Sequence, residues 1–285
     1  MTIKASDVKN LREKTGLGMM DCKRALEEAE GDIDLAITNL RKNSALKAEK
    51  KSSRTAVEGV ILTQCDQGTN NSIILEINCE TDFVAKDKNF INFTKDVLVT
   101  CFESPDKSLE NLSAESLEDR RQSLVQKIGE NIVIRRKSNI SSGFVSSYIH
   151  ANNKIGVIVS LENENEVLGK DIAMHIAASN PLVVNPEDVD NELLSKEREI
   201  IAAQVSGSDK PEEIIEKMIS GRLDKFLSEI SLINQPFVKD PSKKVKSLIE
   251  ESNNKVLSFV RFEVGEGIEV EKKDFAEEVQ AQLNN

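Results

Sequence analysis

Three patterns in the sequence predict an α+β fold. Residues 1–42 place apolar side chains at helical spacing, whereas from residue 56 onward apolar runs of strand length alternate with helical patterns. One strand–turn–strand–helix pattern occurs twice along the chain. We therefore expect an N-terminal three-helix bundle, two repeated α+β subdomains with antiparallel sheets, and an inserted helical hairpin.

The composition argues against several classes of partner. At 285 residues, the chain is long enough for two or more domains. Its net charge of −11 disfavours nonspecific nucleic-acid binding, which needs clustered Lys and Arg. No apolar run approaches the roughly 20 residues of a membrane helix. We expect neither a nucleic-acid nor a membrane partner.

The first residues and the cysteines indicate a cytoplasmic protein. Met1–Lys4 lead directly into a helical pattern, so we expect no signal or transit segment. The cysteines form no C-x-x-C pair and are expected to be reduced, mostly buried thiols. They are Cys22, Cys65, Cys79 and Cys101.

Residues 1–42 contain three short helical patterns. The first ends at Gly16, the second begins near Asp21 and ends at Gly31, and the third is capped by Asp32. Such short helices are stable only if each buries an apolar stripe. The expected inward residues are Val8, Leu11, Cys22, Ala25, Leu26, Ala29, Ile33, Ala36, Ile37 and Leu40.

Met19 and Met20 lie at the start of the second helical pattern. Adjacent residues cannot share one helix face, so at least one methionine is expected to be exposed unless both fold over the small core. Residues 43–55 are rich in Lys and Arg and are expected to form a solvated helical linker. The N-terminal domain with its linker then spans residues 1–54.

Residues 55–140 are expected to form the first subdomain. Ala56–Gln64 and Ile73–Asn78 form a hairpin across a turn-rich connection. Two helices follow, the second ending at Gly129, and Asn131–Lys137 is a further strand. The expected inward helical residues are Phe90, Phe93, Val97, Leu98, Cys101, Leu117, Leu124 and Ile128.

The segment Asn78–Lys86 joins a strand to a helix and contains carboxylates, a hydroxyl and a phenylalanine. Thr81 or Asp82 is a suitable N-cap for the following helix. The Phe83 ring has two alternatives. It packs under that helix, or it projects outward to be buried in another molecule.

The second subdomain repeats the first. Gly59-Val60-Ile61 recurs as Gly143-Phe144-Val145, and Ile73–Ile77 recurs as Val157–Leu161, both at an offset of 84 residues. An internal repeat of this kind predicts two similar α+β units.

The repeat fails at one place. The first copy has Glu80–Val84, whereas the second has only the polar residues Glu162–Asn165. Because the duplicated scaffold does not need the aromatic residue, this difference favours an exposed, functional Phe83.

The second subdomain is expected to comprise residues 141–180 and 229–264. A loop covers Ser231–Lys239, a helix starts at Asp240-Pro241, and Val256–Val264 is the last strand.

Two helical segments lie outside these subdomains. Residues 181–228 form an inserted antiparallel hairpin, in which Asn185-Pro186 opens the first helix and Ser206–Pro211 is the turn. Its apolar surface is a candidate for self-association or for binding a partner. Residues 265–285 form a C-terminal helical module, with an acidic helix over Asp274–Leu283.

The sequence contains no recognisable catalytic or metal-binding motif. Its two histidines, His150 and His175, have no paired cysteine or carboxylate at metal-ligand spacing. His175 is expected to be structural and His150 to be exposed. Phosphate-loop, dinucleotide and nucleophile-elbow motifs are absent. We expect no catalytic residue, no metal and no cofactor.

With these residues in view, the chain resembles the elongation factor Ts family of bacteria over essentially its whole length. Several long motifs in the same order make the resemblance specific. These motifs are Leu11–Gly16, Met19–Lys23, Asn78–Ala85, Lys127–Asn131 and Arg261–Gly267.

The resemblance implies a guanine-nucleotide exchange factor without an active site of its own. It would bind elongation factor Tu and promote GDP release by disturbing the Mg²⁺ and phosphate site during translation elongation. It also implies that the N-terminal domain is a ubiquitin-associated (UBA)-like bundle. The hairpin would be a coiled coil, implicated in dimerisation in some members.

Motif matching also implies partner-binding residues. Thr81, Asp82, Phe83 and Val84 would enter the GTPase domain near Mg²⁺, with Phe83 as a wedge. The other contacts implied are Met19, Met20, Lys23, Ile128, Gly129, His150 and Val238.

Two alternatives remain open from the residues alone. The N-terminal bundle is compatible with an adaptor that binds ubiquitin-like proteins. Glu80 and Asp82, two residues apart, would share a face in an extended segment and are compatible with a hydrolase.

Overall fold

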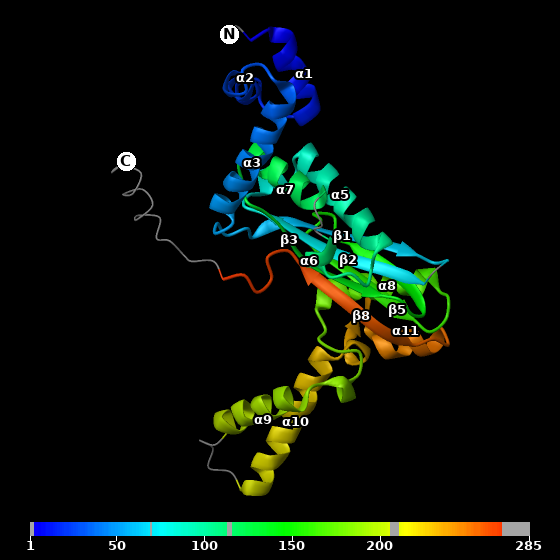
Figure 1. Ribbon diagram of the computed structural model, residues 1–285. Helices are drawn as coiled ribbons and strands as arrows, with labels where there is room; N and C mark the ends of the chain where they lie inside the picture. The colour runs from blue at the N-terminus through cyan, green and yellow to red at the C-terminus, as the bar shows by residue number, and fades with distance from the viewer. Residues whose placement is uncertain (1–2, 69, 113–115, 206–210, 270–285) are drawn as a thin grey trace. The chain divides into compact units, whose positions relative to one another are not determined.

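The computed structural model describes residues 3–68, 70–112, 116–205 and 211–269 (Figure 1). The chain divides into two compact units. The first unit comprises Met1–Val60, Glu76–Arg136 and Val264–Asn285, and the second comprises Ile61–Leu75 and Lys137–Glu263. Helices combine with small antiparallel sheets, which confirms the predicted α+β class.

The first three helices share one apolar core. They are α1 (Ala5–Thr15), α2 (Met19–Glu28) and α3 (Ile33–Lys51). Gly16 ends α1 with a left-handed φ of 68°, and the Asp32 side chain caps α3, both as predicted. The sequence predicts that the second helix begins near Asp21, a residue suited to N-capping, but its N-cap is Gly18 and Asp21 lies in the first turn. The buried residues are Val8, Leu11, Leu17, Cys22, Ala25, Leu26, Ala29, Ala36 and Leu40.

Most of the predicted solvated linker, residues 43–51, is the second half of α3. Its basic side chains Lys47 and Lys50 are exposed, as expected. The opposite face is not solvated, because Ser44 and Ala48 are buried and α3 packs against α7 (Ser116–Ile128). The charge pattern predicted the outer face correctly, but it carried no information about the small residues on the inner one.

Two three-stranded sheets have the orders β1-β2-β3 and β4-β5-β8. Their strands are β1 (Glu58–Asp66), β2 (Asn71–Cys79), β3 (Ile132–Ile140), β4 (Phe144–Ile149), β5 (Ile155–Leu161) and β8 (Val256–Glu263). The central strand β5 pairs antiparallel with both neighbours, and its Val157 lies opposite Tyr148 on one side and Arg261 on the other. A helix follows the second strand of each hairpin, α5 (Lys88–Glu103) after β2 and α8 (Glu166–Ser179) after β5.

Equivalent glycines lie at the same place in both copies. Gly59 and Gly143 have φ values of 147° and 72°, and a Cβ on either would collide with a carbonyl oxygen of the adjacent strand. The oxygens belong to Ile77 and Leu161, which are also 84 residues apart. Close backbone approach therefore requires glycine at both positions.

Replacing Gly143 by alanine should lower the free energy of unfolding by about 1–3 kcal/mol, because the new Cβ meets the Leu161 carbonyl at a strained φ. Gly221→Ala is the matched control. Gly221 lies within a helix with open space around it, so alanine there should raise stability by about 0.5–1 kcal/mol. Urea unfolding measures both, and an unchanged midpoint for Gly143→Ala would contradict the steric argument.

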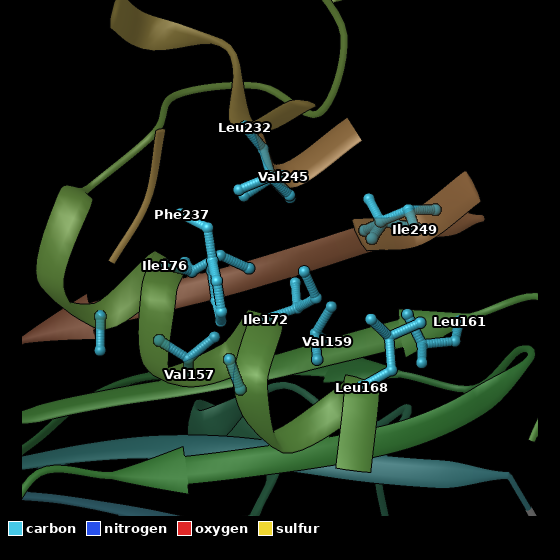
Figure 2. Packing of buried hydrophobic residues seen from close by; sticks show 13 residues of the cluster. Val157, Val159, Leu161, Leu168, Ile172, Ile176, Leu232, Phe237, Val245 and Ile249 are labelled. Carbon is cyan, nitrogen blue, oxygen red and sulfur yellow. The ribbon is translucent and has the colours of Figure 1, made fainter. Parts of the chain in front are cut away.

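The core of the second unit lies between its sheet and α8. Figure 2 shows Leu168, Ile172 and Ile176 of α8 directed toward Val157 and Val159 of β5. Residues from the segment 232–256 complete this core. They are Leu232, Phe237, Val245, Ile249 and Val256.

Residues 181–230 begin with a short 3₁₀ turn, η1 (Pro186–Asp188), followed by α9 (Asn191–Val205) and α10 (Glu212–Ile230). The prediction that Pro186 opens the long helix is therefore wrong, since the proline begins η1. Ile201, Val205 and Ile219 form a small core between α9 and α10. Most of the predicted turn, 206–210, lies outside the described residues.

The chain before β8 also differs from expectation. The loop contains η2 (Leu232–Asn234) and β6 (Pro236–Phe237). Asp240-Pro241 begins a strand, β7 (Asp240–Lys244), which pairs with β6, and the helix α11 starts only at Val245 and ends at Glu251. The predicted helix start is therefore wrong, because the β6–β7 hairpin comes before the helix.

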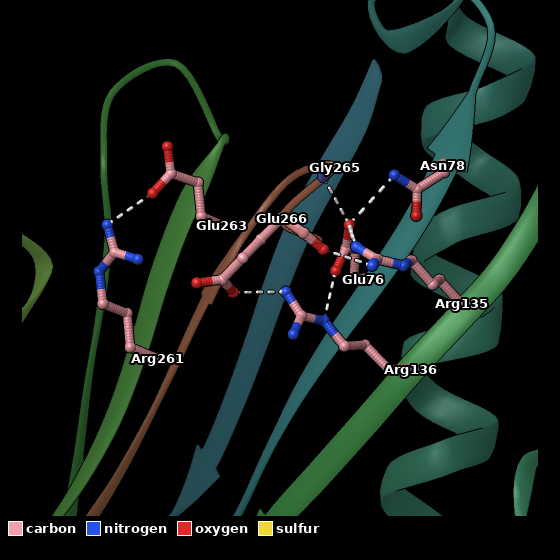
Figure 3. Close-up of polar contacts among 8 residues, drawn as sticks. All are labelled: Glu76, Asn78, Arg135, Arg136, Arg261, Glu263, Gly265 and Glu266. Atoms are coloured by element: carbon pink, nitrogen blue, oxygen red, sulfur yellow. Dashed lines mark hydrogen bonds and ion pairs between the residues drawn. The ribbon is translucent and has the colours of Figure 1, made fainter. Parts of the chain in front are cut away.

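A buried carboxylate in the first unit fastens the turn that follows β8. The Glu76 side chain is fully buried and accepts hydrogen bonds from Arg135 Nη1 at 2.9 Å, Arg136 Nε at 2.5 Å and Gly265 N at 2.8 Å (Figure 3). Arg136 Nη2 also pairs with Glu266 at 3.0 Å.

The predicted helix over 274–283 lies outside the described residues. Within the described part of the chain, no helix is long and apolar enough to cross a membrane.

Candidate partner-binding site

The segment after β2 presents Phe83 to solvent. Thr81 is the N-cap of a one-turn helix, α4 (Asp82–Ala85), and its hydroxyl accepts from Val84 N at 3.4 Å. Phe83 is 82% exposed, whereas Val84 on the same turn is buried. Of the two predicted alternatives, the structure therefore has the projecting ring, and Val84 anchors the turn from below.

The tip segment, which we define as residues 80–84, is held by the carboxylate of Glu130. One oxygen accepts from the backbone N–H of Glu80 at 3.1 Å and of Thr81 at 3.0 Å. The other accepts from the Thr81 hydroxyl at 2.7 Å. In return, the Glu80 carboxylate accepts from Asn131 N at 2.6 Å. We call this reciprocal arrangement of Glu80 and Glu130 the carboxylate clamp.

The clamp also reaches the end of the N-terminal helices. Asn131 Nδ2 donates to the carbonyl of Arg54 at 2.8 Å, and Arg54 lies 3.6 Å from the Glu80 carboxylate. Residues that follow α3 are therefore tied to the tip segment through the start of β3. Glu130 and Asn131 lie in the motif Lys127–Asn131, but the sequence pattern assigns neither residue a role, because hydrogen bonds between distant positions leave no periodic signal.

The hydrolase alternative required Glu80 and Asp82 to share a face. The segment is not extended there, because Asp82 starts α4. Asp82 pairs with Lys86 at 2.7 Å, which raises the pKa of the lysine, while Glu80 is held by Asn131. The contacts of the two acids thus lie with different residues, Lys86 and Asn131, and give no support to a paired acid and base.

Cys79 lies beneath the tip segment as a buried thiol. Burial, followed by the nearby carboxylates of Glu130 and Glu58, raises its pKa to about 12. The thiol donates to the Thr81 carbonyl at 3.2 Å. At neutral pH it is therefore protonated and unreactive.

Two other predicted segments belong to the same unit. On α2, Met19 and Met20 are 52% and 69% exposed, so both methionines project, and Lys23 is exposed beside Glu27. Ile128 and Gly129 are half-buried at the end of α7, where Gly129 has a φ of 92°. Gly129 directly precedes Glu130, so the clamp joins this segment to the tip segment. Met19, Met20 and Lys23 lie on the separate helix α2.

The remaining predicted residues, His150 and Val238, belong to the second unit. His150 is exposed and its Nδ1 lies 3.3 Å from the Tyr148 hydroxyl. Val238 is exposed, and its N–H donates to Nδ1 of His175 at 3.2 Å.

His175 is structural, as predicted. Its Nδ1 accepts from Val238 N, so Nε2 carries the proton and donates to Gln235 Oε1 at 2.9 Å. Burial lowers its pKa, which keeps the ring neutral. In the described ranges, no three His, Cys, Asp or Glu side chains gather as they would around a metal ion.

Comparison with known proteins gives a consistent result. A family model described as "Elongation factor TS" matches residues 80–266. The chain is 53% identical over 281 residues to an elongation factor Ts from Hahella chejuensis, covering 99% of this chain and 98% of the relative. It is 53% identical over 286 residues to one from Teredinibacter turnerae, with coverage of 99% and 98%. For one from Legionella pneumophila, the identity is 49% over 289 residues, with coverage of 99% of both chains.

Proposed function

The chain belongs to the elongation factor Ts family, and from this premise we propose that it binds elongation factor Tu and promotes release of GDP. The observation that supports this most directly is the 82% exposure of Phe83 on an anchored turn. A large apolar ring in that position has no partner within the described part of its own chain. Its burial in another protein would be favourable.

The required size of the interface follows from comparing the binding free energy of the nucleotide with that of one buried Phe side chain. A nucleotide held at nanomolar Kd is bound by roughly 12 kcal/mol. Burying one Phe side chain supplies only about 1.5–3 kcal/mol. Phe83 therefore acts as a wedge that needs a broad interface around it. We assign that interface to the exposed Met19, Met20 and Lys23 and to the segment at Ile128 and Gly129, with His150 and Val238 as further contacts from the second unit.

The wedge is proposed to act at the Mg²⁺ and phosphate site of the GTPase. Asp82 and Phe83 would enter that region, with Thr81 and Val84 fixing the turn that carries them. No metal, cofactor or catalytic residue of this chain takes part. Thermodynamic reciprocity requires GDP to weaken the affinity of this protein for the GTPase by the same ratio as this protein weakens the affinity of the GTPase for GDP. The ternary complex is therefore a transient one.

We further propose that the N-terminal helices are a UBA-like module and that the chain works in the bacterial cytoplasm as a translation factor. The predicted domain bounds stand as part of this proposal. They are 1–54, 55–140, 141–180 with 229–264, 181–228 and 265–285. Leu193, Ile200 and Ile214 are exposed on α9 and α10, which makes 181–228 the segment to test for dimerisation.

The decisive experiment is release of a fluorescent GDP analogue from purified elongation factor Tu. Substoichiometric amounts of this protein should accelerate release at physiological Mg²⁺, because an exchange factor turns over. Excess unlabelled GDP is included to block rebinding of the analogue and, by reciprocity, to release this protein from the GTPase so that it can act again. Release at the intrinsic rate at every concentration of this protein would refute the proposal.

A further inference from the structure

The projecting turn that carries Phe83 is too short to hold itself. An isolated helical turn of four residues is unstable in water, because fixing the backbone dihedrals of a first turn costs more free energy than its hydrogen bond provides. Its N-cap bond from Val84 N to Thr81 is long, at 3.4 Å. The Asp82–Lys86 pair is exposed and contributes little. The orientation of Phe83 must therefore be fixed by other contacts.

The buried Val84 side chain is one such contact, and Glu130 supplies the hydrogen bonds from outside the tip segment. Its two oxygens take three donors, namely the N–H groups of Glu80 and Thr81 and the Thr81 hydroxyl, at 2.7–3.1 Å. A carboxylate is suited to this, because it is acceptor-only and its bonds are charge-assisted. The two N–H groups lie at the start of the turn, so the direction in which Phe83 leaves the sheet depends on them.

The second copy of the repeat provides an internal comparison. There, Asn254 precedes β8 by two residues, as Glu130 precedes β3. Asn254 accepts from Asn163 N at 3.0 Å and donates to Asn163 O at 2.9 Å. A neutral amide is thus sufficient to hold the equivalent turn where no aromatic tip exists. The carboxylate occurs in the copy that carries Phe83.

We propose that Glu130 is a positioning residue for nucleotide exchange, which holds the tip segment so that Phe83 already projects in the free protein. This rests on the proposed exchange function. Preorganisation of this kind removes an ordering cost from the encounter with the GTPase. Glu130 need not touch the partner to do so.

Glu130→Gln tests the proposal. The amide keeps the shape of the side chain but can accept with only one of its two terminal atoms. We expect the maximal rate of GDP release to fall about tenfold, within the roughly 100-fold that a 1 Å misplacement can cost. The concentration of this protein giving half-maximal rate should change little, because the rest of the interface is intact.

The same substitution in a Phe83→Ala background separates positioning from general structure. If Glu130 acts through Phe83, Glu130→Gln should change the residual rate of that background less than twofold. An equal fold-loss in both backgrounds, or a parent-like rate for Glu130→Gln alone, would overturn the proposal. If the parent protein itself fails to accelerate release, the proposed function is what has failed.

Two further variants test whether the effect of Glu130→Gln comes from the tip segment or from a general loss of structure. Glu130→Asp keeps the charge but shortens the side chain, so it cannot satisfy all three donors. If Glu130→Gln does not fold, Glu130→Asp is assayed in its place, in the parent protein and in Phe83→Ala. Asn254→Ala is the matched control, because it removes the corresponding clamp from the copy without a tip. It should lower the melting temperature without changing the exchange rate. A loss of exchange equal to that of Glu130→Gln would also overturn the proposal.

Discussion

Replacing Phe83 by alanine is expected to slow catalysed GDP release by about 10- to 150-fold. Burial of the ring in the partner is worth about 1.5–3 kcal/mol, and each 1.36 kcal/mol corresponds to a factor of ten. The variant should fold normally, because the ring is 82% exposed and its removal leaves no cavity. A change in the free energy of unfolding within about 0.5 kcal/mol is expected. Stopped-flow release of fluorescent GDP and urea unfolding measure the two quantities.

Phe90→Ala is the matched control for this prediction. Phe90 lies seven positions further along the chain and is fully buried on α5. The same substitution there should cost about 3–5 kcal/mol of stability, through lost burial and a cavity. Phe83→Ala would contradict the wedge assignment in either of two ways. It could release GDP at the parent rate, or it could lose stability comparable to that of Phe90→Ala.

Phe83 was predictable because the sequence contains its own comparison. The repeat at an offset of 84 residues marks which residues the scaffold needs, and the tip motif is missing from the second copy. The local chemistry of Thr81 was predictable as well, since hydroxyl N-caps act within three residues. The helix α5, however, is capped by Asp87, because α4 takes up the residues in between.

The carboxylate clamp was not predictable in the same way. Glu130 bonds to residues 49 and 50 positions earlier in the chain, and nothing in helical or strand periodicity couples such positions. The sequence offered two weak signals for Glu130, namely its place between a helix-ending glycine and a strand and its membership of the motif Lys127–Asn131. Residues that position a functional group through long-range hydrogen bonds are therefore those that a sequence pattern misses first.

The error at Asp240-Pro241 has a comparable origin. Proline is favoured at the first position of a helix, so Asp-Pro before Val245 indicated a helix start. In the structure, Pro241 lies in β7, which pairs with β6 through Phe237 opposite Asp240 and Pro236 opposite Lys244. Proline is tolerated in a strand at a sheet edge, where its missing N–H is not needed. Pairing with β6 thus overrides a valid local preference.

The second large effect is expected at Glu76. Glu76→Gln should lower the free energy of unfolding by about 3–5 kcal/mol, because it removes one partner of a buried ionic cluster and leaves the others uncompensated. The glutamine has one accepting oxygen where Glu76 has two, so Arg135, Arg136 and the Gly265 N–H would no longer all have an acceptor, and both guanidinium groups would lose their counter-charge (Figure 3). Glu166→Gln is the control, since Glu166 pairs with Lys170 on an exposed helix face and should change stability little.

The pH dependence of this effect has a definite sign. Burial alone would raise the pKa of Glu76, but hydrogen bonds from Gly265, Arg136, Arg135 and Asn78 outweigh it and hold the pKa below its ordinary value of 4.5. Because the folded-state pKa is depressed, the stabilisation is complete above about pH 4.5 and is lost as the pH falls through the folded-state pKa. The stability difference between the parent protein and Glu76→Gln should therefore be constant from pH 7 to 5 and shrink at lower pH. Urea unfolding across this range measures it. A difference that instead grew on acidification would mean that Glu76 is protonated in the native cluster.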